Sequence, residues 1–350
     1  MASPAQRKAS PPIREFDLIR QLQRRHGAGN ASILRGIGDD AAVIVPSRRA
    51  WQLLTTDLLT EGIHFDLRTA TCFDIGFRAV AANLSDIAAM GGRPQYLLVA
   101  IAVPRSGSGR EILQLYRGMM AACRSHKVRL IGGDTSASSS GWFVGITLIG
   151  SVPPGRALLR SGARVGDDIY VTGTLGDSLA GLALLEEARN GAATTSLPER
   201  HRRYLLRRHL HPTARIEEGH WLSARRWATA AIDVSDGLSG DLRHICEESG
   251  VGAEIDLAAL PLSPALRTYA KSAGRDPVAL ALAGGEDYEL LFTVPARDRP
   301  RFERMAAGRR LHAARIGAIG PARAGIRAVS PDGRRRPLPV TSYEHFRSGG

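Results

Sequence analysis

The stretch "GIGDDAAVI", Gly36 to Ile44, fits G-x-G-x-x-A, the glycine pattern that places the phosphates of a dinucleotide on a helix N-terminus. Its middle positions hold Asp39 and Asp40, and two carboxylates facing a pyrophosphate would repel it. The next residues, "AAVIV", are β-branched and strand-like, whereas the dinucleotide fold requires a helix there. Either the match is accidental, or phosphates meet these aspartates through a metal ion.

Acidic residues recur along the chain at the ends of apolar strands or beside glycine. Beyond the first pair they are Asp57 in "LLTTD", Asp86 in "NLSD", Asp134 after "LIGG", Asp233 and Asp236 in "DVSD", and Glu286 and Asp287 after "AGG". A single aspartate of this kind is more often a cap or a turn residue. Strand ends at one edge of a sheet converge, however, and five or more carboxylates there would repel one another without cations. The set therefore predicts a metal site.

The types of ligand indicate which metal. Carboxylates with the hydroxyls of Thr55 and Thr56 nearby are hard oxygen ligands, and no histidine or cysteine accompanies them at ligand spacing. This composition favours Mg²⁺ over Zn²⁺. Protein-bound Mg²⁺ commonly bridges substrate phosphates, so we expect a nucleoside triphosphate as substrate. The chain has neither a G-x-x-x-x-G-K-[ST] loop nor the H-R-D and D-F-G set, which excludes P-loop ATPases and protein kinases.

Length and composition bound the fold. The 350 residues are 43% hydrophobic and include 38 glycines, values typical of two globular α/β domains. No apolar run is long enough to span a membrane. The first 13 residues contain charge and proline but no apolar segment, and they predict a disordered basic leader rather than a secretory signal. The three cysteines stand far apart, which suits the cytoplasm.

The net charge of +13 raises an alternative function. A basic surface attracts nucleic acid as well as phosphorylated metabolites. The excess lies in the leader, in residues 199–215 and in "DGRRRP", while aromatic residues make up only 5% of the chain. Without interleaved aromatic residues for base stacking, a solvated arginine-rich face is the simpler explanation. A basic nucleic-acid-binding protein remains the alternative from another class.

The apolar patterns predict alternating helices and strands. We expect a helix over 14–26, a hairpin of "AAVIV" with "WQLLTTD", a helix over 73–92 and a strand in "QYLLVAIAVP". A helix over 109–126 and strands in "VRLIGGD" and "WFVGITLIGSVP" follow, the former running into a loop at its aspartate. A polar turn near 153–166 then predicts a domain boundary, with domains at 14–152 and 153–350.

Seven motifs carry a family resemblance. "GIGDDAAV", "TTDLLTEGIHF", "AVAANLSDIAAMGGRP", "LIGGDT", "RALLRSGARVGDDIYVTGTLGDS", "IDVSDGLSGDL" and "GGEDYELLFTV" resemble, in this order and spacing, the motifs of thiamine-monophosphate kinases. That family belongs to the aminoimidazole-ribonucleotide (AIR)-synthetase-like ATP-binding superfamily. The resemblance implies a two-domain PurM-like fold of α/β (α+β) type whose N-terminal sheet forms the core of a homodimer. It also implies phosphorylation of thiamine monophosphate by ATP to thiamine diphosphate; another AIR-synthetase-like ATP-dependent enzyme is the nearest alternative.

The resemblance also implies roles for individual residues. The ligands of several Mg²⁺ ions would be Asp40, Thr55, Thr56, Asp57, Asp86, Asp134, Asp233 and Asp236, and Asp86, Asp134 and Asp236 would assist catalysis through the metal. ATP would contact Gly133, Asp134, Arg160 and Ser235, and the second substrate would contact His64 and Glu286. Val340 stands where the family has a C-terminal aromatic residue, so Tyr343 is the candidate for that contact.

Overall fold

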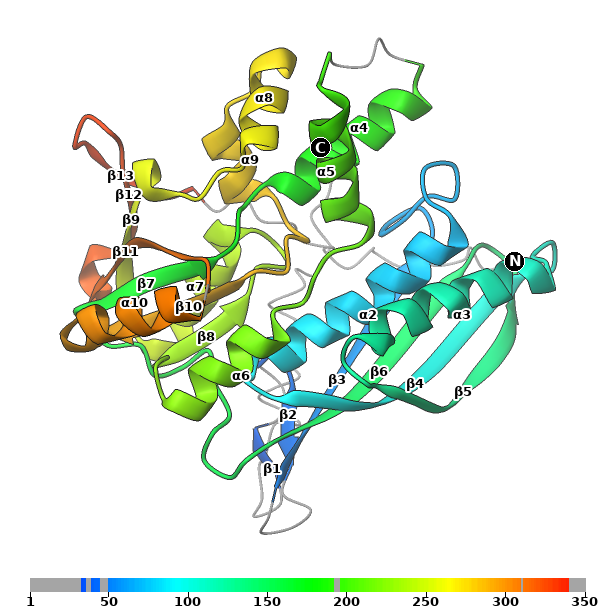
Figure 1. Ribbon diagram of the computed structural model, residues 1–350, viewed down its shortest axis with the longest axis horizontal. Coiled ribbons are helices and arrows are strands. Elements are labelled where there is room, and N and C mark those ends of the chain that lie inside the picture. Colours follow the sequence, from blue (N-terminus) through cyan, green and yellow to red (C-terminus); the bar gives the residue numbers. More distant parts are fainter. Residues whose placement is uncertain (1–32, 36–38, 45–49, 192–195, 310, 340–350) are drawn as a thin grey trace, which may run out of the picture.

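The computed structural model describes residues 33–35, 39–44, 50–191, 196–309 and 311–339. The predicted leader, the predicted helix over 14–26, the glycines of "GIG", Val340 and Tyr343 lie outside the described residues. The described chain forms two sheets, each with its own helices (Figure 1). This arrangement confirms the mixed fold of two sheet-based domains.

The first sheet has six strands. Along the sheet they are β1 (Ile33–Arg35), β2 (Ala42–Ile44), β3 (Trp51–Thr60), β6 (Phe143–Val152), β4 (Arg93–Pro104) and β5 (Arg129–Ser138). β2 pairs with β3 in antiparallel register, which confirms the predicted hairpin. β4 and β5 form the parallel pair at the other edge.

Two strands run further than the sequence suggested. β3 continues past Asp57 to Thr60, because residues 58–60 keep pairing with β6. β5 continues through Asp134 to Ser138, where a loop was expected, because it follows β4 in parallel register. Asp57 and Asp134 therefore lie inside strands, and the prediction that these two aspartates end their strands was wrong.

Helices α2 (Cys72–Ala89) and α3 (Gly109–Arg124) lie side by side over one face of this sheet (Figure 1). α2 begins with a capping box in which Thr71 and Asp74 satisfy each other's free backbone N–H groups. Gly76 lets the two helices approach closely, since a Cβ there would lie 2.0 Å from the carbonyl oxygen of Leu115. The expected helices over 73–92 and 109–126 are thus confirmed, and α2 is held firmly against the sheet.

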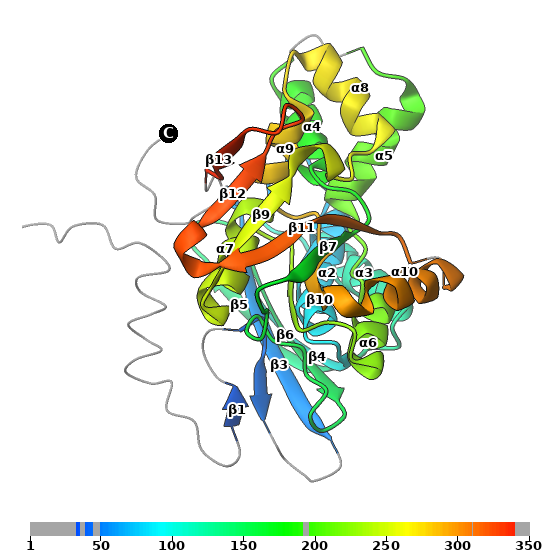
Figure 2. The ribbon, with the colours of Figure 1, turned by 90° about the vertical axis from the view of Figure 1, so that its left-hand side faces the viewer.

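The second sheet has seven strands. In order they are β13 (Arg335–Pro337), β12 (Ile326–Val329), β9 (Val251–Asp256), β11 (Ala313–Pro321), β7 (Asp167–Thr172), β10 (Leu290–Pro295) and β8 (Ala230–Asp233). Its helices are α4 (Asp177–Arg189), α5 (Glu199–Leu210), α6 (Ile216–Arg225), α7 (Leu238–Ser249), α8 (Pro264–Ala273), α9 (Pro277–Ala283) and α10 (Arg299–Gly308). Figure 2 shows α4, α5, α8 and α9 gathered at one end of the molecule.

The domains meet along α2. Gly219 in α6 allows this contact, because a Cβ there would lie 2.0 Å from the carbonyl oxygen of Ala88. An aromatic cluster of Trp221, Trp227 and Phe302 packs α6 against α10. The same packing places α2 beside β8, so Asp86 of the first domain comes near Asp233 of the second.

Among the described residues, no helix has both the length and the apolar character needed to cross a bilayer.

Candidate active site

Three carboxylates from distant parts of the chain meet at the domain boundary. Asp40 precedes β2, Asp86 lies in the last turns of α2, and Asp233 ends β8. One oxygen atom from each lies within 4.8 Å of the others. We call Asp40, Asp57, Asp86 and Asp233 the acidic cluster, since Asp57 on β3 acts electrostatically on both Asp86 and Asp233.

The acidic cluster is electrostatically unfavourable without a cation. Burial, and after it the charges of the other aspartates, raise the pKa of Asp86 well above its ordinary range. Burial and the charge of Asp40 act on Asp233 in the same way and raise its pKa. Burial raises the pKa of Asp57 from its ordinary value of 3.8 to about 6. At neutral pH the folded protein therefore gains by binding a positive charge here.

Nearby donors satisfy only part of the acidic cluster. Arg160 donates to both oxygens of Asp40, from Nε at 3.1 Å and from Nη2 at 2.8 Å. The Thr55 hydroxyl donates to Oδ2 of Asp86. Oδ2 of Asp233 is buried and has no hydrogen-bond partner among the described residues. Hard oxygen ligands with an unpartnered buried carboxylate oxygen fit Mg²⁺.

Not all the predicted ligands join the cluster within one chain. Thr56 follows Thr55 on the opposite face of β3, where its hydroxyl donates to the carbonyl oxygen of Ile146 at 2.9 Å. Asp134 lies on β5, three strands from β3, which at the usual spacing is about 14 Å away. Gly133 has a structural reason for being glycine, because a Cβ there would lie 1.9 Å from the carbonyl oxygen of Val99. The binding roles of these three residues stay predictions.

Two loops of the second domain lie side by side next to the acidic cluster. The first holds Ser235 and Asp236 after β8, and the second holds Glu286 before β10. The backbone N–H of Glu286 donates to the carbonyl oxygen of Ser235 at 2.7 Å, and that of Tyr288 donates to Val234 at 2.9 Å. Glu286 and Tyr288, which donate these two hydrogen bonds, have φ values of 60° and 51°, in the left-handed region.

The predicted substrate residues are also close together. His64 lies in the loop after β3, and its Nδ1 accepts a hydrogen bond from the backbone N–H of Thr60 at 3.0 Å. Arg78 of α2 donates from Nη2 both to Glu286 Oε1 and, at 3.1 Å, to the carbonyl oxygen of His64. The structure thus brings His64 and Glu286, from different domains, to the same guanidinium group.

Comparisons with known proteins agree with this geometry. The AIR synthase related protein family matches with its N-terminal domain at residues 38–152 and with its C-terminal domain at residues 164–329. The thiamine-monophosphate kinase of Salmonella typhimurium is 42% identical over 288 residues, 81% of this chain and 84% of that protein. The kinase of Bacillus subtilis is 35% identical over 336 residues, 95% of this chain and 99% of that protein.

The chain belongs to the thiamine-monophosphate kinase family. Among solved structures, AaThiL complexed with AMPPCP and TMP has a TM-score of 0.83 at 34% identity and covers 97% of this chain and 100% of its own. The structure of thiamine-monophosphate kinase from Stenotrophomonas maltophilia has a TM-score of 0.72 at 39% identity, covering 91% and 96%. The fold and the family resemblance drawn from the motifs are confirmed.

Several residues that lie beside the predicted site residues were not among those predicted from the sequence. Arg78 and His209 flank Glu286, and no motif marked either of them. Asp241, in the first turn of α7, is buried and accepts the backbone N–H of Gly237 at 3.1 Å. Burial and the nearby Asp236 raise the pKa of Asp241. The signal for Asp241 was present, since an aspartate in the first turn of a helix is a common capping position.

A second group of buried acidic residues supports the Glu286 loop. Glu289 accepts two hydrogen bonds of 2.6 Å from Arg215, one of 3.0 Å from Arg208 and one of 2.6 Å from Thr172. Asp287 accepts the backbone N–H groups of Gly176 and Ser178. We call Asp287, Glu289, Arg208 and Arg215 the loop-support cluster. Burial alone would raise the pKa of Glu289, but the contacts with Arg215 and Arg208 lower it.

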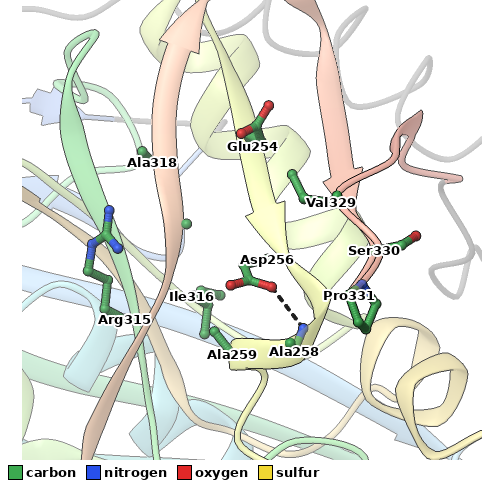
Figure 3. Close-up of a pocket in the computed structure, with 12 residues that line it drawn as sticks. Glu254, Asp256, Ala258, Ala259, Arg315, Ile316, Ala318, Val329, Ser330 and Pro331 are labelled. Carbon is green, nitrogen blue, oxygen red and sulfur yellow. Dashed lines mark hydrogen bonds between the residues drawn. The ribbon is translucent and has the colours of Figure 1, made fainter.

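A cavity of about 480 Å³ lies elsewhere, on the second sheet among β9, β11 and β12 (Figure 3). Its charged groups already have protein partners. Asp256 accepts the backbone N–H of Ala258, Glu254 pairs with Arg335, and Arg315 donates to Asp168. The cavity holds none of the predicted site residues, so the candidate site of this family member is the region of the acidic cluster.

Proposed function

We propose that this protein transfers the γ-phosphate of ATP to thiamine monophosphate, giving thiamine diphosphate and ADP. The observation that carries the proposal is the acidic cluster, which lies beside the loop of Glu286 in a chain similar throughout to AaThiL complexed with AMPPCP and TMP. Enzymes of this activity are phosphotransferases with a phosphate group as acceptor, EC 2.7.4.16.

The protein would hold Mg²⁺ through Asp40, Asp57, Asp86 and Asp233 together with Thr55. Bound Mg²⁺ supplies positive charge that offsets repulsion between two anionic phosphate groups. Arg160, already held by Asp40, adds a fixed cation for the nucleotide phosphates. Asp236 and Ser235 lie on the loop that also positions Glu286. We propose the contacts of Thr56, Gly133 and Tyr343 on the family resemblance alone.

The acceptor itself removes the need for a general base. A phosphomonoester has its second pKa near 6 and is therefore largely a dianion at neutral pH. Its oxygen can attack the γ-phosphorus directly, and the bond to the β-phosphate oxygen breaks to release ADP. The chain's residues then have to align two phosphates and exclude water. We propose direct transfer without a phosphorylated enzyme, and a labelled protein trapped with γ-labelled ATP would overturn this.

The decisive experiment is an assay with ATP, Mg²⁺ and thiamine monophosphate. The expected product is thiamine diphosphate, formed in equal amount to ADP. Phosphorylation of free thiamine, with none of its monophosphate, would contradict the proposal. A different AIR-synthetase-like activity would instead appear as ATP hydrolysis that thiamine monophosphate does not stimulate.

We also propose that the protein is a homodimer formed through the first sheet. The face of this sheet opposite α2 and α3 exposes apolar side chains, including 57% of Leu58 and 42% of Tyr96, and Ile131 on the edge strand β5 is 55% exposed. Apolar surface of this kind marks an interface. Light scattering at micromolar concentration should give twice the chain mass, and Leu58→Glu should produce monomers.

In the proposed dimer, Asp134 could reach an acidic cluster, which it does not reach within its own chain. Since Asp134 is about 14 Å from β3 within its own sheet, we propose that it acts on the acidic cluster of the partner subunit. Asp86→Asn and Asp134→Asn variants should each be inactive, but a mixed dimer would contain one intact site. Mixing the two after subunit exchange should restore about a quarter of wild-type activity, and failure to restore any would contradict this role.

We propose a cytoplasmic location, which suits three free and buried cysteines.

Nucleic-acid binding is the weaker alternative, because Arg208 and Arg215 of the arginine-rich segment point inward to Glu289. Salt-sensitive RNA binding by the purified protein without turnover of ATP would favour the alternative instead.

A further inference from the structure

Arg78 connects three segments of the chain at the predicted substrate site. Its side chain is only 3% exposed, in the middle of α2. Nη2 donates to Glu286 Oε1 and to the carbonyl oxygen of His64, and Nη1 lies 3.4 Å from Nε2 of His209 on α5. One guanidinium group therefore fixes the positions of His64, Glu286 and His209 relative to one another.

The contact with Arg78 determines the state of His209. A guanidinium group can only donate, so Nε2 of His209 must accept and the ring proton must be on Nδ1. Nδ1 lies 3.1 Å from Ser178 Oγ and 3.5 Å from Oε2 of Glu286. Burial, reinforced by the charge of Arg78, lowers the pKa of His209 to about 4. His209 is thus neutral, and its Nδ1–H donates to Ser178 Oγ while lying 3.5 Å from Glu286.

Glu286 is consequently held by Arg78 and along its backbone, with His209 beside it. Its N–H donates to Ser235, Oε1 accepts from Arg78, and Oε2 faces His209. Burial alone would raise the pKa of Glu286, but the charge and hydrogen bond of Arg78 lower it. The side chain nevertheless remains 30% exposed. An ionised carboxylate with a fixed orientation and an exposed edge is suited to accept hydrogen bonds from a ligand.

A purely structural role explains this arrangement less well. A buried ion pair often stabilises a protein no more than apolar side chains of the same volume would. An interdomain ion pair is present elsewhere, between Arg93 and Glu217, and its side chains are 51% and 63% exposed. Arg78 differs from Arg93 because its partners are the two predicted substrate residues rather than surface groups.

We propose that Arg78, assisted by His209, is a positioning residue that orients Glu286 toward the organic part of the phosphorylated substrate. The inference rests on the proposed function, and it assigns to Arg78 and His209 roles that the motifs did not indicate. Thiamine monophosphate offers a matching group, the exocyclic amine of its pyrimidine ring. Arg78 contacts no nucleotide residue that we have named, so it should affect the recognition of one substrate only.

The test is a double-mutant cycle measured by steady-state kinetics. Arg78→Met should raise KM for thiamine monophosphate by about 10- to 100-fold, since a hydrogen bond to a charged group contributes roughly that factor. KM for ATP should stay within about threefold. Arg78→Lys, which keeps the positive charge, should recover most of the loss. In a Glu286→Gln background, Arg78→Met should have little further effect, because Arg78 acts through Glu286.

Arg93→Met is the matched control and should leave both KM values unchanged. Should Arg78→Met fold poorly, the variant carrying Arg78→Met with Glu286→Gln removes both charges, and its kinetics are compared with those of Glu286→Gln alone. Effects that add in the double variant, or equal rises in both KM values, would overturn the inference. A wild-type enzyme that does not phosphorylate thiamine monophosphate would instead refute the proposed function.

Discussion

Glu289 of the loop-support cluster and the aspartates of the acidic cluster are buried carboxylates with opposite electrostatic balance. Glu289 of the loop-support cluster receives hydrogen bonds from two arginines and a threonine. In the acidic cluster, Arg160 pairs with Asp40, while one oxygen of Asp233 has no hydrogen-bond partner within the described part of the chain. Burial, followed by the neighbouring charges, raises the pKa values of Asp86 and Asp233. Burial would also raise the pKa of Glu289, but its contacts with arginine lower it.

The difference separates a structural function from a binding function. Carboxylates whose counter-charges belong to the protein need no external cation, and removal of one partner leaves a buried charge uncompensated. Carboxylates that lack them leave the folded protein with repulsion that an external cation relieves. Buried carboxylates thus have different roles, and the two arginines that bind Glu289 distinguish it from Asp86 and Asp233.

The largest expected effect is on the loop-support cluster. Arg215→Met removes two hydrogen bonds to Glu289, which has no exposed side-chain surface. We expect the free energy of unfolding to fall by about 3–5 kcal/mol, because a buried charge loses two hydrogen bonds that contribute about 1.5–3 kcal/mol each. Denaturant unfolding should show this loss equally with and without Mg²⁺. Arg93→Met, in an exposed pair, should cost no more than about 1 kcal/mol.

Asp86→Asn should reduce activity rather than stability, in contrast to Arg215→Met. The asparagine oxygen can still accept from Thr55, and the substitution removes repulsion within the acidic cluster. We expect kcat to fall more than about 100-fold, since even residues that only support metal ligands cost 10- to 100-fold. Stability without metal should be unchanged or higher. Asp256→Asn is the control and should leave kcat unaffected, because Asp256 lies in the separate cavity.

Mg²⁺ should stabilise the wild-type protein through the acidic cluster. At 100 times its dissociation constant, a ligand of the native state adds about 2.7 kcal/mol. Thermal unfolding should therefore shift upward with Mg²⁺ in the wild type and in Arg215→Met, but much less in Asp86→Asn. An equal shift in all three would mean that the ion binds elsewhere.

The pH dependence of the metal-free protein should be a smaller effect. The pKa of Asp57 rises from 3.8 in the unfolded chain to about 6 in the folded protein. Between these values the folded state keeps a proton that the unfolded state releases, so stability falls as pH rises from about 4 to 6. Asp57→Asn should flatten this slope in urea unfolding with a chelator present. An identical slope in Asp57→Asn and the wild type would contradict the raised pKa of Asp57.

The sequence predicted one of the two clusters better than the other. Asp40, Asp86 and Asp233 stand in short motifs whose acidic excess is visible in the linear chain. The arginines of the loop-support cluster lie in a segment that looked like a solvated basic helix. Their inward direction depends on Glu289, 74 positions from Arg215, and no local pattern shows a pairing at that separation.

The sequence by itself determined the order of helices and strands, the two-domain fold and the family, because hydrophobic periodicity and short acidic motifs are local properties. It did not determine which carboxylates share a site. Asp57 and Asp134 both follow apolar segments, yet strand pairing places one in the acidic cluster and the other about 14 Å away. Tertiary packing of α2 against β8 decided that Asp86 meets Asp233, and that Arg78 of the same helix reaches Glu286. Burial and charge balance arise only from such distant contacts, so only the folded structure distinguishes a cation site from an internal ion pair.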